Sequence, residues 1–210
     1  MSKLSSILII LFFTASSASG QILKYEVVKG SKKLGDMVVE RKAYNDEVSY
    51  NVESKVVFRL LFSFTVDFES SALYKNNILE RESTTSKLNG STQKSSDIVR
   101  KGDNYSLTSG GVSSTEKGPI TYSIASIYHH EPENGQQVFS PQFGQYLTFE
   151  RIGEHKYEME SPDGINEYTY MNGICTEVKV SRDFAKFYFK MSPETYYAVK
   201  NMEDSVMGGN

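Results

Sequence analysis

The chain has 210 residues, with 23 Lys and Arg against 26 Asp and Glu, one cysteine and no tryptophan. The net charge of −3 and the absence of a clustered basic run argue against nucleic-acid binding. A single cysteine excludes an internal disulfide, so the fold must be stabilised by burial alone. The length suffices for one domain with a proper core.

The first twenty residues have the pattern of a secretory signal peptide. Lys3 precedes a short apolar run at 4–13, and small residues at 18–20 offer a cleavage site. A membrane span would need about 20 apolar residues, whereas serines and threonine dilute this stretch. We therefore expect residues 1–20 to be removed from an exported chain that is periplasmic, with an extracellular location as the alternative. An uncleaved anchor is the alternative, and no later run is long enough to span a membrane.

Regularly spaced turn residues separate runs in which apolar and polar residues alternate, which is typical of antiparallel strands joined by hairpins. The clearest case is Asn172-Gly173 between residues 167–171 and 174–178, because both turn residues tolerate positive φ. The predicted fold is mainly β: a strongly curved antiparallel up-and-down sheet, an open or half barrel, with one short helix packed against it. We expect one β domain at 21–192 and a short helix or frayed tail at 193–210.

Residues 56–68 form the most regular apolar run and predict one long strand. Seven side chains would share a face: Val56, Phe58, Leu60, Phe62, Phe64, Val66 and Phe68. An ordinary core strand explains this pattern, and a ligand-lining strand is the alternative. Residues 81–118 are polar by contrast, and we expect strands that bury little, exposed at one end of the sheet rather than disordered.

Residues 119–131 break the alternation. Pro119 suits a first helical turn, Ile120, Ile124 and Ile127 recur at helical spacing, and Pro132 ends the run. The pattern predicts a helix of about ten residues that packs on the sheet. A second short helix is predicted after Ser192-Pro193, with Tyr196, Val199 and Met202 on one side.

No catalytic set, metal site or cofactor motif emerges from the residue spacing. His129 and His130 are adjacent, whereas two helical ligands normally lie three or four residues apart, so we place them in the last helical turn. Cys175 falls within a predicted strand and is expected to be inert; a thiol hydrolase would need His155 and a carboxylate beside it. Glu158 and Glu160 are interpreted as a solvated strand face rather than a glycosidase pair.

Several segments resemble a family of uncharacterised secreted Bacteroidota proteins, a domain of unknown function. They are FSPQFGQY at 139–146, YEMESPDG at 157–164, YTYMNGICTEV at 168–178, YHHEP at 128–132 and LKYEV at 23–27. The resemblance implies no catalytic residues. More distantly, the layout is similar to lipoprotein-carrier folds, in which a curved sheet holds an acyl chain beneath a helix; that similarity concerns the fold and is a weak guide to function.

Two functions of different classes follow from these patterns. The first is an envelope protein that binds or carries a hydrophobic or lipid ligand in the concave sheet. Its expected ligand-binding residues are Phe58, Leu60, Phe62, Phe64, Ile124 and Ile127. The alternative is a structural or partner-binding envelope protein without a small-molecule ligand, which offers strand edges within 81–118 to another chain. An enzyme is the third interpretation.

Overall fold

The computed structural model describes residues 19–59, 63–182 and 185–202. Over these residues the chain forms fourteen strands and one helix. They are β1 (Ser19–Lys29), β2 (Lys32–Tyr44), β3 (Glu47–Arg59), β4 (Ser63–Lys75), β5 (Ile78–Leu88), β6 (Ser91–Lys101), β7 (Asn104–Ser109), β8 (Val112–Lys117), β9 (Gln137–Ser140), β10 (Gln145–Gly153), β11 (Lys156–Ser161), β12 (Gly164–Met171), β13 (Ile174–Arg182), β14 (Ala185–Met191) and α1 (Pro193–Lys200).

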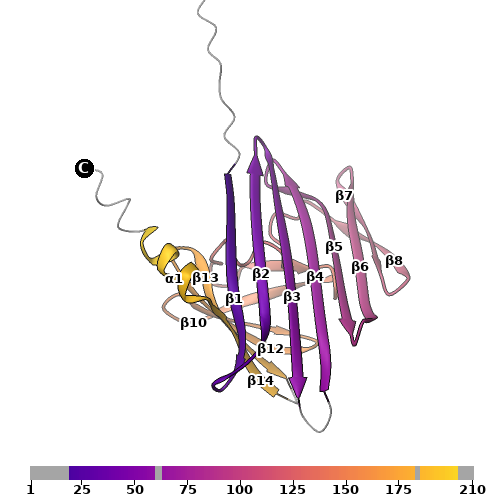
Figure 1. Ribbon diagram of the computed structural model, residues 1–210. Coiled ribbons are helices and arrows are strands. Elements are labelled where there is room, and N and C mark those ends of the chain that lie inside the picture. Colours follow the sequence, from indigo (N-terminus) through magenta and orange to yellow (C-terminus); the bar gives the residue numbers. More distant parts are fainter. Residues whose placement is uncertain (1–18, 60–62, 183–184, 203–210) are drawn as a thin grey trace, which may run out of the picture.

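All these strands belong to one antiparallel sheet, in which neighbouring strands are consecutive in the chain except at one seam, and β8 and β9 form its two edges. The order is β8-β7-β6-β5-β4-β3-β2-β1-β14-β13-β12-β11-β10-β9. At the seam β1 pairs with β14, so the first and last strands lie side by side. The long strands β1–β4 lie in front of β10–β13, which cross behind them (Figure 1). The sheet therefore curls on itself without closing, and the predicted mainly β, open up-and-down fold is confirmed.

The Asn-Gly signal marks a hairpin as predicted. Asn172 and Gly173 join β12 to β13 with φ angles of 52° and 75°. Positive φ at both central residues is what the tightest hairpin turns require. The turn preference of these two residues therefore matches the observed pairing of β12 with β13.

The single strand predicted at 56–68 is wrong, because this run is divided between β3 and β4. The two strands pair antiparallel, with Val56 opposite Val66 and Phe58 opposite Phe64. Each pair joins two even-numbered residues, so the apolar alternation continues from one strand to the next on the same face. The shared face is therefore real although the chain reverses within it.

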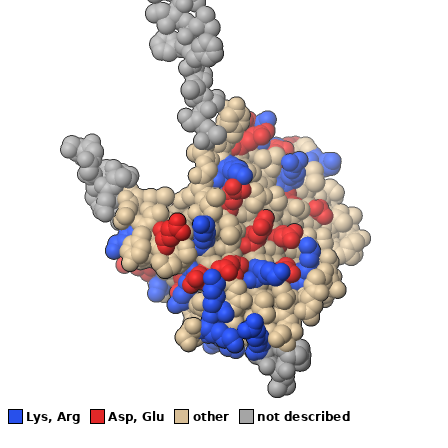
Figure 2. Space-filling model, viewed as in Figure 1, with Lys and Arg blue, Asp and Glu red and all other residues tan. Residues whose placement is uncertain are grey.

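The outward face of the sheet carries interspersed acidic and basic side chains (Figure 2). Several form ion pairs at its surface, among them Lys42–Glu40 at 2.9 Å and Lys33–Asp36 at 2.6 Å. The inward face carries the apolar side chains. In β2, for example, Met37 and Val39 are buried while their neighbour Val38 is 40% exposed.

Strands β5–β8 bury more than their polar composition predicts. Leu79, Ile98, Tyr105 and Leu107 form a core cluster together with Tyr50, Ala72, Tyr74, Ile120, Ala125 and Phe139. Few apolar residues suffice because they fall on the inward face, together with the buried polar residues Glu82, Thr84 and Ser96, whereas most serines and lysines of these strands are exposed. Strands β5–β8 therefore form the ordered, one-sided extension of the sheet that we expected. They contribute to a separate core cluster, which we did not expect.

Residues 118–136, here called the crossover segment, lie between β8 and β9 and do not form the predicted helix. Bends and turns take its place, and its backbone bonds to strands from both halves of the sheet. The Leu79 amide donates to the Ile120 carbonyl (2.8 Å), and the Cys175 amide donates to the Tyr128 carbonyl (3.0 Å). The Ile124 amide donates to the Phe139 carbonyl (3.0 Å). Bonds to the sheet replace the helical ones, so His129 and His130 do not end a helix.

The C-terminal helix is confirmed as α1. Ser192 caps its N-terminus by accepting a hydrogen bond from the Thr195 amide, and Pro193 occupies the first turn, where its missing N–H costs nothing. Its buried residues are Thr195 and Val199, whereas Tyr196 and Met202 are about 40% exposed. The predicted apolar side is therefore wrong except for Val199. Within the described residues no helix is long and apolar enough to cross a membrane.

Candidate functional site

A cavity of about 270 Å³ lies inside the curled sheet, between its two halves and the crossover segment. Its apolar wall combines strands that are remote in sequence: Met37, Val56, Phe58, Val66, Phe68, Leu147, Met159, Val178, Val180, Phe187 and Phe189. Ile124, Ile127 and Tyr128 of the crossover segment also line it. The cavity exists because the inward faces of β2–β4 and of β10–β14 oppose one another across the curl.

Three of the six predicted ligand-binding residues, Phe58, Ile124 and Ile127, line this cavity. Phe64 is not in its wall but stacks on Phe58, with ring centroids 5.1 Å apart. Leu60 and Phe62 lie outside the described residues. Ile124 and Ile127 reach the cavity from turns rather than from a helical lid.

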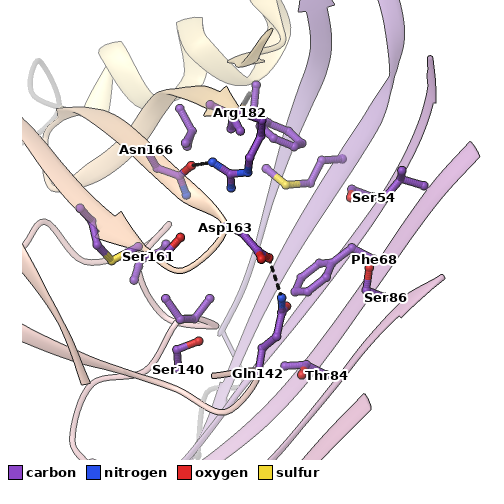
Figure 3. Close-up of a pocket in the computed structure, with 18 of the residues that line it drawn as sticks. Ser54, Phe68, Thr84, Ser86, Ser140, Gln142, Ser161, Asp163, Asn166 and Arg182 are labelled. Carbon is purple, nitrogen blue, oxygen red and sulfur yellow. Dashed lines mark hydrogen bonds between the residues drawn. The ribbon is translucent and has the colours of Figure 1, made fainter. Parts of the chain in front are cut away.

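One part of the cavity wall is polar. The Arg182 guanidinium donates to Asn166 Oδ1 at 3.0 Å, as Figure 3 shows, and to the Ser181 carbonyl at 2.9 Å. Partial burial lowers the pKa of this guanidinium from its ordinary value, but an arginine stays charged in proteins. The cavity therefore has apolar walls and a fixed positive group at one edge.

An ion pair at the cavity rim joins the two halves of the sheet. Lys94 of β6 contacts both carboxylate oxygens of Asp163, in the turn between β11 and β12, at 2.9 Å. Gln142 donates to the same carboxylate at 3.2 Å (Figure 3). Lys94 also lies over the Phe143 ring, 5.0 Å from its centroid. These contacts cover part of the rim with side chains that are exposed to solvent.

Sequence reasoning missed most of this wall. Met159, Val178 and Phe187 show the ordinary alternation of core strands, and nothing local distinguishes a side chain that faces a cavity from one that faces a filled core. Arg182 carried one usable signal, because a charged residue at an inward position of an alternating strand calls for a partner.

The comparisons with known proteins place the chain in a family. The family model described as "Domain of unknown function (DUF6134)" matches residues 25–192. The chain belongs to this family. No curated protein matches it significantly in sequence. One solved structure with a similar fold is described as a β-barrel-like protein of domain of unknown function DUF1849 from Brucella abortus.

That structure is 10% identical in sequence, with a TM-score of 0.50, and the match covers 85% of this chain and 98% of the other. At this identity the likeness concerns the fold alone. It agrees with the curled, unclosed sheet of the DUF6134 chain. The match of the family model confirms the predicted domain of unknown function. A Bacteroidota origin and secretion do not follow from either comparison.

The residues considered for catalysis do not come together around the thiol. Cys175 is fully buried, and burial raises the pKa of its thiol above the ordinary value, so it stays protonated. His155 Nδ1 bonds instead to Glu131 Oε1 at 2.9 Å, and the Tyr157 hydroxyl donates to the same oxygen at 2.9 Å. Among the described residues no group of three His, Cys, Asp or Glu side chains is placed to hold a metal ion.

Proposed function

We propose that this protein binds a single apolar or amphipathic ligand, such as one lipid chain, in the cavity between the two halves of its sheet. The cavity of about 270 Å³ carries the proposal, because its walls are mainly aliphatic and aromatic side chains. Binding sites for small ligands are typically concave, largely apolar and supplied with a few fixed polar groups. Burial of apolar ligand surface would contribute roughly 25 cal/mol per Å².

The proposal includes export. The leader-like pattern of residues 1–20 and the resemblance to secreted Bacteroidota proteins support a chain that works in the cell envelope, in the periplasm or beyond. Fractionation of cells that produce the full chain tests this part: recovery of the shortened chain in the periplasmic fraction is expected, and full-length chain in the cytosol would contradict it.

The binding test uses an uncharged fluorescent probe of apolar sites, N-phenyl-1-naphthylamine, followed by native mass spectrometry after incubation with extracted envelope lipids. The proposal predicts probe fluorescence that these lipids reverse, and a protein ion that carries one lipid. A delipidated protein that takes up neither probe nor lipid would overturn the proposal.

A matched pair of variants locates the bound probe. Val66→Trp fills cavity space, whereas Val57→Trp adds the same side chain to the opposite face of the same hairpin. We expect Val66→Trp to weaken probe binding about tenfold or more, which corresponds to loss of about 1.4 kcal/mol. Val57→Trp should leave it unchanged, and equal effects of both variants would place the probe elsewhere.

One observation favours the alternative function, a partner-binding envelope protein. Strand β8 is an edge of the sheet and almost wholly exposed, and its Val112 is 73% exposed. An exposed edge can accept a strand of another chain. Cross-linking in intact cells separates the two: a stoichiometric protein partner attached through β8, with no lipid bound, would favour this alternative.

A further inference from the structure

A second pocket, of about 370 Å³, lies between β2, β3, β4 and the crossover segment. It shares no lining residue with the apolar cavity. Six residues characterise its wall: Arg41, Tyr50, Tyr74, Thr121, His130 and Gln136. We call it the Arg41 pocket. Its lining combines hydrogen-bond donors with aromatic rings, so it differs in chemistry from the apolar cavity.

Arg41 points into the curl of the sheet. It follows the buried Met37 and Val39 at alternate positions of β2 and pairs across the strands with Tyr50. Among the described residues no carboxylate lies within ion-pair distance of its guanidinium, whereas the adjacent Lys42 forms an outward ion pair with Glu40 at 2.9 Å. An inward, half-buried cation without an anion is costly unless a ligand supplies the missing charge.

Apart from Glu131, the groups around Arg41 are neutral or donors. The Tyr50 hydroxyl and His130 Nε2 are hydrogen-bonded at 2.7 Å. Burial first, and Arg41 second, lower the pKa of both His129 and His130, so neither ring competes with Arg41 for an anion as a second cation near neutral pH. His129 is 6% exposed, and neither of its ring nitrogens has a partner among the described residues.

One carboxylate, Glu131, also lines the pocket, but its oxygens are engaged on the other side. Oε1 accepts from the Tyr157 hydroxyl (2.9 Å) and contacts His155 Nδ1 (2.9 Å), and Oε2 lies 3.2 Å from the same nitrogen. Arg41 forms no ion pair with it at 4 Å or less within the described part of the chain. The guanidinium therefore lines the pocket beside the Tyr50 hydroxyl, without an anionic partner among the described residues.

We propose that the Arg41 pocket binds a small organic oxyanion, a carboxylate or a phosphate monoester, through the Arg41 guanidinium, with the Tyr50 and Tyr74 rings against the non-polar part of the ligand. Arginine is suited to this role because its planar fork donates two parallel hydrogen bonds to one oxyanion. Of the adjacent residues His129, His130 and Glu131, the last two thereby belong to the wall of this pocket rather than to a metal site.

The test measures binding of three probes of similar size by NMR titration of the full chain: benzoate, phenyl phosphate and the uncharged benzamide. The proposal predicts that at least one oxyanion binds about tenfold or more tightly than benzamide and shifts the ring signals of His130. The stronger of the two oxyanions identifies the ligand as a carboxylate or as a phosphate. No binding by either oxyanion, or binding equal to that of benzamide, would overturn it.

Two substitutions that each remove one positive charge from β2 serve as variant and control. Arg41→Gln should weaken oxyanion binding about tenfold or more, whereas Lys42→Gln, on the outward face, should leave it unchanged. Arg41→Lys keeps the charge without the fork and should give an intermediate loss, so it replaces Arg41→Gln if that variant fails to fold. Unchanged affinity in a folded Arg41 variant would contradict the proposal. Displacement of the naphthylamine probe reports on the apolar cavity separately.

Discussion

Two buried titratable residues lie at inward positions without a full set of hydrogen bonds. Glu82 is 1% exposed, its Oε1 lies 3.4 Å from the Ser70 hydroxyl, and its Oε2 has no partner within the described residues. Burial raises the pKa of its carboxyl to about 7, and burial lowers the pKa of the His129 imidazole to about 3. Both shifts favour the neutral form, so both side chains oppose ionisation of the folded state.

The Glu82 shift predicts that stability depends on pH. The folded state holds the Glu82 proton more tightly than the unfolded state does. The stability that protonated Glu82 contributes is therefore fully present below pH 4.5 and is lost as pH rises to about 7. His129 acts in the opposite direction and loses stability as pH falls from 6.5 towards 3. Glu82→Gln should therefore gain stability relative to the parent chain as pH rises from 4.5 to about 7, by roughly 3 kcal/mol over that interval.

Urea unfolding of the parent chain and of Glu82→Gln at intervals between pH 4 and 8 measures this difference directly, since the His129 contribution cancels. Glu69→Gln, an exposed carboxylate whose side chain is 59% accessible, is the control and should show no such trend. Parallel stability curves for Glu82→Gln and its parent would contradict the assigned shift.

Tyrosine hydroxyls hold the irregular crossover segment in place. The Tyr170 hydroxyl donates to the Ile127 carbonyl at 3.0 Å, and the Tyr122 hydroxyl donates to the His130 carbonyl at 2.8 Å. The Tyr105 hydroxyl accepts from the Ile120 amide at 3.2 Å and donates to the Leu79 carbonyl. A non-helical segment in a protein interior needs partners for its backbone groups, and these side chains supply them.

Tyr170→Phe should therefore destabilise the protein by about 1–3 kcal/mol, because it leaves the buried Ile127 carbonyl without its donor. Amide hydrogen exchange at Ile124, which bonds to Phe139, should accelerate at the same time. Tyr44→Phe, at a side chain that is 56% exposed, is the matched control and should change stability by less than about 0.5 kcal/mol. Equal unfolding curves for the two variants would argue against this role of the hydroxyl.

The curl of the whole sheet decides what the molecule can enclose. The β1–β14 seam makes one continuous surface from the two halves, and the Lys94–Asp163 pair connects β6 to the turn between β11 and β12 at the cavity rim. Both side chains are more than 40% exposed, so the pair should contribute less than about 1 kcal/mol to stability. We expect this ion pair to affect how fast a ligand enters and leaves the cavity instead.

Asp163→Asn should leave the unfolding free energy within about 1 kcal/mol of the parent value, since exposed ion pairs contribute little. It should also increase the rate at which the naphthylamine probe enters and leaves the cavity, because the contact across the rim is weakened. Stopped-flow fluorescence measures both rates. Glu69→Gln breaks the outward Lys87–Glu69 pair as a control; an equal change of rate in both variants, or none in Asp163→Asn, would contradict a role at the rim.

Local sequence patterns alone determined the fold class, the Asn172-Gly173 hairpin and the start of α1 at Ser192-Pro193. These features depend on φ preferences, capping and alternation over a few residues, which a sequence displays directly. They also placed Phe58, Ile124 and Ile127 on apolar faces, and those side chains do line the cavity.

Only the tertiary structure decided where residues 56–68 reverse, why residues 119–131 are not a helix, and which faces enclose the two pockets. Each depends on partners remote in sequence: Tyr25 donates to the Cys175 carbonyl at 2.6 Å, and the Cys175 amide bonds to Tyr128. Helical spacing at 119–131 was a local preference of about a kilocalorie per residue or less, and bonds to the sheet outweighed it. The tertiary structure also decided that Arg41 and Arg182 line pockets, because only the curl of the sheet shows that these two cations face inward.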